Sequence, residues 1–433
     1  MPLKILPERN KDWSLFPATK TVAFYATEAN FIELSEVSSE ELVKALDQTD
    51  PNSSYSVIPL LLHELRHWLD HTSTLWGRHR LASLFEALSA RHQDDEQEFW
   101  RIVSYRRLLR EDVRDEYFST IGDTTPRPTP QWLWKAQTSM GVGFDNDGRP
   151  NEAAPIVFSR FEWPDGKPAC RVPLSIGALL ETNAVSFELL AAFALMQRLP
   201  EGPRKVEEAI ASKKWFSQLY DPELGVYSVA VHLAANKLGI SNSAEAYRCS
   251  AALASLALNI PTACFDSIEV PAAFAPWGER NRACLKQRSR SYAYLALLHH
   301  SAAIQEGQDL SDWLETTLLH AGLPDLSELE TQARAEMKAI GSNATLVNPY
   351  QDRFKLLEQV GDENFALLGA HPTLDVVLAR MTELNFCPVV TADLEWKFLG
   401  KQNALQGEDR AEQWFETVSN LLRRFTEFTE ACS

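Results

Sequence analysis

The sequence predicts a mainly α-helical protein of the α+β class, with a small β element near the N-terminus. Apolar residues recur at three- and four-residue spacing over most of the chain, as amphipathic helices require. Residues 21–35 are instead rich in β-branched and aromatic side chains, which indicates one or two short strands around a turn at 28–30. With 433 residues, 45% of them hydrophobic, the chain is long enough for two or three ordinary domains or for one large domain with insertions.

The first helices can be placed from capping and proline signals. Ser38 is a capping residue and predicts a short helix to about residue 46, and residues 50–54 read as a polar loop. Pro59 then suits the first turn of a helix, where a missing N–H is tolerated. We therefore expect an apolar helix that starts at about residue 59 and ends near residue 72.

The middle of the chain alternates between helical and irregular patterns. Two amphipathic helices are expected over 74–91 and 96–118. The segment 122–172 is rich in proline and turn residues, with a strand-like alternation at 156–163 that could hold a peptide by edge pairing. A long helix follows at about 174–198, and the chain beyond residue 200 reads as mainly helical.

Charge and cysteine usage limit the classes of partner. The net charge of −17 argues against nucleic acid and anionic membranes as partners, because both attract basic surfaces. The segment from Met1 to Leu15 carries no apolar run typical of a secretion signal. The six cysteines are scattered, without a C-x-x-C pair, which excludes a zinc ribbon and favours free thiols in a reducing compartment. We expect a cytoplasmic protein whose oligomeric state the sequence leaves open.

The most informative motif is His63-Glu64-Leu65-Arg66-His67, which has the pattern H-E-x-x-H. Residues four apart share one face of a helix, so His63 and His67 can direct two imidazole nitrogens at one metal ion. Glu64 lies one step further round the helix, within reach of a metal-bound water. The preceding residues 58–62 are apolar, so the motif helix is expected to be buried. Polar side chains on a buried helix need partners, and a metal ion would supply one.

A third ligand is expected from the long helix at 174–198. Glu181 and Glu188 are seven residues apart in this apolar helix and share a face, with Ala184 between them. The small side chain of Ala184 would allow close packing against another helix. Glu181 is the better candidate for a ligand or for a residue that supports the ligands, and Glu188 is a possible alternative. Either glutamate alone could instead form a surface ion pair.

Two further polar residues follow the motif, and we expect them to support the site. His71 is eight residues beyond His63 and would lie about 12 Å along the helix axis, too far for the same ion. Asp70 and His71 are therefore expected to orient ligands rather than bind the metal, with direct ligation as the alternative.

The motif and its partner helix resemble the gluzincin group of zinc metallopeptidases. Residues 177–181 (GALLE) resemble the G-A-x-x-E of the thermolysin-like glutamate helix, and residues 181–187 resemble the E-x-x-A-x-x-F of the ImmA/IrrE-type peptidases. The resemblance implies a zincin-like core in which His63, His67 and Glu181 bind one Zn²⁺ and Glu64 is the general base. The gap between the motif and Glu181 is longer than in either relative, which implies a large helical insertion.

These expectations lead to a zinc-dependent peptidase, selective and intracellular, that acts through a zinc-activated water on a protein or peptide substrate. The oxyanion donor is expected among Tyr220, Tyr227 and His232, which follow the glutamate helix. Residues 1–200 would form the catalytic region, and residues 201–433 a helical region of unknown role. Two alternatives stay open: a helical interaction or scaffold protein with an inactive or structural H-E-x-x-H site, and a zinc hydrolase of a non-peptide amide.

Overall fold

The computed structural model describes residues 22–92, 96–114, 117–120, 133–144, 147–163, 165–305, 307–407 and 409–419. The chain divides into two compact units. The first unit comprises residues 1–107, 337–369 and 374–433, and the second comprises residues 108–336 and 370–373. Both units are mostly helical with a small sheet each, which confirms the mainly α, α+β class.

The first unit contains a four-stranded sheet and a set of helices. Its elements are β1 (Ala23–Ala26), β2 (Phe31–Leu34), α1 (Ser39–Leu46), α2 (Pro51–Thr72), α3 (Leu75–His92), most of α4 (Glu96–Val113), the end of α12 (Leu326–Asn343), α13 (Tyr350–Leu368), α14 (Leu374–Ala379), β7 (Val389–Thr391), β8 (Trp396–Lys397) and a helix over 409–419.

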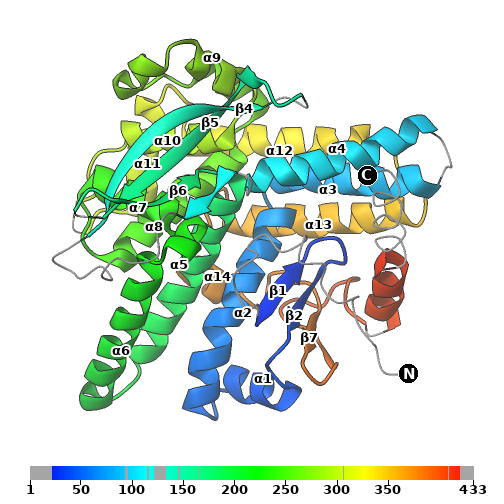
Figure 1. Cartoon of the computed structure of the whole chain (residues 1–433). Coiled ribbons are helices and arrows are strands. Elements are labelled where there is room, and N and C mark those ends of the chain that lie inside the picture. The colour runs from blue at the N-terminus through cyan, green and yellow to red at the C-terminus, as the bar shows by residue number, and fades with distance from the viewer. Residues whose placement is uncertain are drawn as a thin grey trace. The chain divides into compact units, whose positions relative to one another are not determined.

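The sheet of the first unit is built from strands that lie far apart in the sequence, β1 and β2 near its start and β7 and β8 near residue 390. Its strand order is β1-β2-β7-β8, with β2 parallel to β7, so that Ile32 pairs with Val389. The predicted strands at 21–35 are β1 and β2, and the turn between them ends at Asn30 in the left-handed region, with φ 56°. Helix α2 packs beside β1, as Figure 1 shows. The indole N–H of Trp68 on α2 donates to the carbonyl of Asn385, just before β7.

Helix α2 begins eight residues before the expected start. The carboxylate of Asp50 accepts hydrogen bonds from the backbone N–H groups of Asn52 and Ser53, and Pro51 occupies the first turn. The expected loop at 50–54 is therefore wrong, and Pro59 lies inside the helix rather than in its first turn. The helix tolerates the loss of the hydrogen bond that Pro59 cannot make, because tertiary packing holds it on both sides.

Helices α3 and α13 pack against each other and against α2 in the first unit. Arg78 on α3 is fully buried, and its guanidinium contacts the carboxylates of Glu358 at 2.9 Å and Asp362 at 2.8 Å on α13. Gly361, between these two acids, lies directly against the backbone of Thr72 at the end of α2. The C-terminal end of the motif helix is therefore held by close backbone packing.

The second unit contains the other sheet and most of the remaining helices. Its elements are the end of α4, β3 (Ser119–Thr120), β4 (Lys135–Phe144), β5 (Pro150–Glu162), β6 (Pro168–Pro173), α5 (Ile176–Met196), α6 (Glu201–Leu219), α7 (Gly225–Leu238), α8 (Ser243–Asn259), α9 (Glu279–Lys286), α10 (Arg290–His300), α11 (Leu310–His320), the start of α12, and the 3-10 turns η3 (Pro222–Leu224), η4 (Thr262–Ser267) and η5 (Ala272–Trp277).

The sheet of the second unit has the order β3-β6-β5-β4 and is antiparallel throughout. The strand expected at 156–163 lies within β5, which pairs with β4 on one side and β6 on the other. The expectation that this strand offers a free edge to a peptide is therefore wrong. The outer edge belongs to β4, where the carbonyl of Met140 accepts a hydrogen bond from Arg280.

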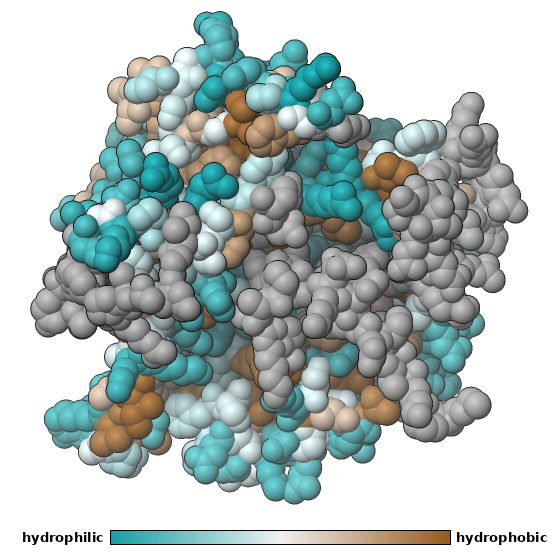
Figure 2. Space-filling model, in the orientation of Figure 1, coloured by the Kyte–Doolittle hydropathy of each residue, from teal (hydrophilic) through white to brown (hydrophobic). Residues whose placement is uncertain are grey.

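Helix α5 forms the centre of the second unit and packs against α7 and α8. Among the described residues, it is the one helix long and apolar enough to cross a bilayer, and 61% of that stretch is buried inside the structure. Helix α6 has no buried residue, and Figure 2 shows hydrophobic side chains gathered over it, where Val206 and Ile210 are each 58% exposed.

Helix α4 ends five residues before the expected end, because Arg114 adopts a left-handed conformation with φ 58°.

The division into units also differs from the expected boundary at residue 200. Strands β7 and β8 come from the C-terminal half of the chain yet complete the sheet of the first unit, so the second unit is inserted into the first along the sequence.

Candidate metal centre

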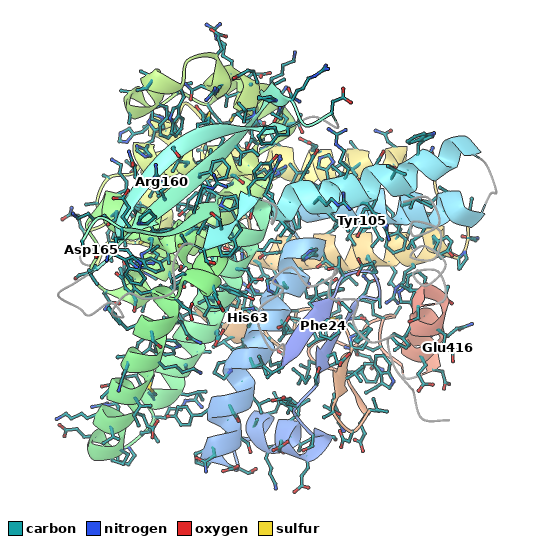
Figure 3. The ribbon with its side chains drawn as sticks, viewed as in Figure 1. Phe24, His63, Tyr105, Arg160, Asp165 and Glu416 are labelled. Carbon is teal, nitrogen blue, oxygen red and sulfur yellow. The ribbon has the colours of Figure 1, made fainter. Side chains whose placement is uncertain are left out.

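His63 and His67 lie on one face of α2, one helical turn apart. Their ring centroids are 5.0 Å apart and their planes are inclined at 76°. Both side chains are half-buried. Figure 3 labels His63 on α2 and Phe24 on β1 of the same unit. The helical spacing expected for the motif is present.

Glu64, the expected general base, is 5% exposed on the same helix. Its carboxylate lies within electrostatic range of the Cys387 thiol, which lies shortly before β7. Burial raises the pKa of Cys387 above its usual range, and the charge of Glu64 adds to that shift.

Glu181 and Glu188 are the two ionisable residues of α5. The helix starts at the N-cap Ser175, whose hydroxyl accepts a hydrogen bond from the N–H of Ala178. Glu181 is 4% exposed, whereas Glu188 is half-buried. The hydroxyl of Tyr247 on α8 lies within electrostatic range of both carboxylates, and burial together with these charges raises its pKa.

His63, His67 and Glu181 form a group that could hold a metal ion. One ligand atom from each residue lies within 4.8 Å of the other two. Glu188 does not belong to this group.

Asp70 and His71 occupy the C-terminal turns of α2. Asp70 is 1% exposed and accepts hydrogen bonds from the guanidinium of Arg66, one turn earlier, at 3.0 and 3.2 Å. The Nδ1 atom of His71 lies 2.8 Å from the carbonyl oxygen of His67. Its ring packs against Tyr25 and Trp76, and burial lowers its pKa to about 4. Neither residue joins the metal group.

The three expected oxyanion donors lie on or just before α7. Tyr220 and His232 pack in an aromatic cluster with Trp134 and Phe161, and the Nε2 atom of His232 lies 2.8 Å from the carbonyl oxygen of Leu219. Burial lowers the pKa of His232 to about 4, so the ring is neutral near pH 7.

The third expected donor, Tyr227, accepts a hydrogen bond at its backbone carbonyl from the hydroxyl of Tyr247 at 3.2 Å. A role for any of the three in binding an oxyanion stays a prediction.

Sequence reasoning missed two residues that border the candidate site. Tyr247 lies on a different helix from Glu181, and Cys387 lies near the opposite end of the sequence from Glu64. Neither lies in a recognisable motif, and only tertiary packing brings them close. The described cysteines, Cys170, Cys249, Cys264, Cys284 and Cys387, are buried free thiols, as expected.

No protein-family model, no curated protein and no solved structure matches this chain. The functional argument therefore rests on the geometry of the residues themselves.

Proposed function

We propose that this chain is a zinc-dependent peptidase whose metal is held by His63, His67 and Glu181. The observation that carries the proposal is the grouping of these three ligand atoms within 4.8 Å, with Glu64 adjacent to the first ligand. Two histidines four apart on one helix, joined by a buried glutamate from another, provide three protein ligands. Three is the number that leaves a fourth position of a catalytic zinc open.

The donor set favours zinc over the other common divalent cations. Magnesium and calcium prefer oxygen ligands, whereas two imidazole nitrogens and one carboxylate oxygen are typical of catalytic zinc. Bound zinc would supply a water of lowered pKa and an electrophile for the substrate carbonyl. The N₂O donor set of this chain fits that chemistry.

The remaining steps fall to side chains of α2. Glu64 would take the proton of the attacking water on a carboxylate oxygen and deliver it to the leaving nitrogen. The contact between His71 Nδ1 and the carbonyl of His67, and the buried Arg66–Asp70 pair, stiffen the last turns of the helix. A rigid α2 holds the two imidazoles in place, since a small displacement of reacting groups costs rate.

A peptide is the proposed substrate, and the support is the resemblance of the motif and of residues 177–187 to gluzincins. A non-peptide amide would need the same chemistry, but no described contact favours it. An intracellular location suits the five described cysteines, which are all free thiols.

Metal analysis of variants tests the proposal. Purified native protein should carry one zinc per chain, which His63→Ala, His67→Ala and Glu181→Ala should each lose. Glu188→Ala is the matched control, because it removes a carboxylate from the same face of α5 and should keep the zinc. Glu64→Gln should also keep the zinc and lose about 10²- to 10⁴-fold in peptide cleavage.

Three outcomes would contradict this assignment. Native protein without zinc would remove the peptidase proposal. Loss of zinc in Glu188→Ala but not in Glu181→Ala would exchange the third ligand. A zinc-loaded Glu64→Gln protein with undiminished activity in every assay would favour the scaffold alternative, in which the metal is structural.

A further inference from the structure

The helix over residues 409–419 packs on the first unit through one apolar face. Ala411, Trp414 and Val418 are buried on this face, and Phe415 is half-buried beside them. Their spacing is typical of a helix that docks on an apolar surface. Glu416, labelled in Figure 3, is exposed on the other side of the helix. Isolated helices this short are marginal in water, so the helix depends on the surface beneath it.

Three buried aromatic side chains receive the helix, and we call them the Phe85 platform: Phe31 on β2, Phe85 on α3 and Tyr350 on α13. The ring of Trp414 stacks on Phe85, with 5.9 Å between the centroids and 12° between the planes. Its edge faces Tyr350 at 6.3 Å. Phe415 packs edge-on against Phe31 at 5.6 Å. The helix is therefore held mainly by contacts between aromatic rings.

Hydrogen bonds do not fix the helix on the platform. Among the described residues, the indole N–H of Trp414 has no acceptor, and the guanidinium of Arg410 donates to the nearby carbonyl of Ala404. A cation–π contact adds to the aromatic packing, with the guanidinium carbon of Arg353 at 5.0 Å from the Trp414 ring. An identical helix from another copy of the chain could make the same contacts.

A glycine connects the helix to the preceding part of the first unit. Leu405 is fully buried, and the side-chain amide of Gln406 donates to two backbone carbonyls at 2.9 and 3.2 Å, so the chain is fixed up to this point. Gly407 follows with φ 130°, a conformation that other residues rarely adopt. A Cβ atom there would meet only the Arg410 Cδ atom, at 3.9 Å. Rotation at Gly407 can therefore redirect the helix without moving the fixed residues.

We propose that the helix over 409–419 is exchangeable, and that the Phe85 platform of one copy binds this helix from a second copy of the chain. Exchange keeps every contact of the helix and changes only the connection at Gly407. A platform without a helix would expose three aromatic rings, so one copy or the other must cover it. The inference is independent of the proposed peptidase activity, because none of these residues belongs to the metal group.

Tethering sets the concentration at which exchange occurs. A helix joined by a short connection reaches an effective concentration of about 1 mM at its own platform. The native chain should therefore be monomeric at micromolar concentrations and dimerise only near the millimolar range. A change that disfavours the closed connection, while leaving helix and platform intact, should move dimerisation to lower concentrations.

Gly407→Ala makes this change, because alanine disfavours a φ of 130°, whereas an extended connection between two copies accepts it. Sedimentation of the full chain should give a dimer dissociation constant at least about tenfold below that of the native protein. Gly148→Ala is the matched control. Gly148 has a φ of 75° with no atom within 4 Å of a Cβ, so this variant introduces strain of the same kind away from the helix and should keep the native constant.

Mixing two weakened variants identifies the surface that forms the dimer. On the Gly407→Ala background, Phe85→Leu weakens the platform, and Trp414→Ala weakens the helix. Neither chain alone should dimerise at a concentration where Gly407→Ala does. An equimolar mixture should form a heterodimer, since the intact helix of one chain meets the intact platform of the other. Energy transfer between fluorescent labels on the two chains measures this pairing.

Two results would overturn the proposal. The first is a Gly407→Ala chain with the same dissociation constant as the Gly148→Ala control. The second is a Gly407→Ala dimer that Phe85→Leu and Trp414→Ala chains still form alone, since another surface would then hold it. Gly407→Ala removes no packing contact, so the first measurement remains decisive if either core variant fails to fold.

Discussion

Replacing Gly361 with alanine should destabilise the protein, although alanine is the better helix former. Gly361 lies inside α13, and a Cβ atom there would lie 2.1 Å from the carbonyl oxygen of Thr72 and 2.9 Å from its carbonyl carbon. These are backbone atoms at the end of α2, so they cannot rotate away as a side chain can. The terminal nitrogen of Arg78 would be 3.3 Å from the same atom.

The size of the effect follows from two opposing terms. Alanine gains about 0.5–1 kcal/mol over glycine in a helix interior. To reach even 3.0 Å, below which real Cβ atoms essentially never lie, α13 and α2 must separate by about 0.9 Å at this point. Overpacking of this kind costs about 1–3 kcal/mol, and the upper end applies where both sides are backbone. The net loss should be about 2 kcal/mol.

Urea unfolding followed by circular dichroism measures this loss. The shift should appear in the transition of the first unit, because a chain with two compact units need not unfold in one step. Gly202→Ala on α6 is the matched control, since a Cβ there has no atom within 4 Å. Its free energy of unfolding should match the native value or exceed it by up to about 1 kcal/mol. A Gly361→Ala midpoint equal to the native one would refute the close approach of α13 to α2.

Two further predictions concern charged groups. Asp70→Asn should lower the free energy of unfolding by about 3–5 kcal/mol, because it removes the carboxylate that the fully buried guanidinium of Arg66 contacts. Glu40→Gln, at an exposed ion pair, should lower it by less than about 0.5 kcal/mol. Equal losses in the two variants would contradict the argument from burial. Hydrogen bonds, first that from Lys401, lower the pKa of Glu363 to about 2, so its stabilising effect is present above the unfolded pKa of 4.5 and is lost as the pH falls toward 2. The urea midpoint of Glu363→Gln should therefore fall less than that of the native protein over this pH range, and parallel curves would disprove the assignment.

Local signals predicted the elements whose ends are set by neighbouring residues. The α1 helix is capped as expected, since the Ser38 hydroxyl accepts from the N–H of Glu41 and the Glu41 carboxylate accepts from the N–H of Ser38. The turn between β1 and β2 and the helical spacing of His63 and His67 are likewise set by short-range geometry. The grouping of Glu181 with the histidines followed from a single argument about carboxylates in an apolar helix.

The expectations that failed depended on contacts between distant segments or on competing local signals. Pro59 and Pro51 both suit a first turn, and the capping carboxylate of Asp50 decides between them. The sheet partners of β2 and β5 depend on strands that no local pattern specifies, because pairing is fixed by packing rather than by spacing. The proximity of Glu64 to Cys387 is a long-range contact of the same kind.

The parallel pairing of Ile32 with Val389 has a consequence for synthesis on the ribosome. Strand β2 leaves the ribosome first, and its partner β7 can follow only after the more than 350 residues that separate Ile32 from Val389 have been made. The second unit, apart from residues 370–373, is contiguous and can fold while the first waits for its C-terminal strands. Closing so long a loop is slow. Helix α5, with its two carboxylates, can therefore fold before the sheet beside α2 is complete.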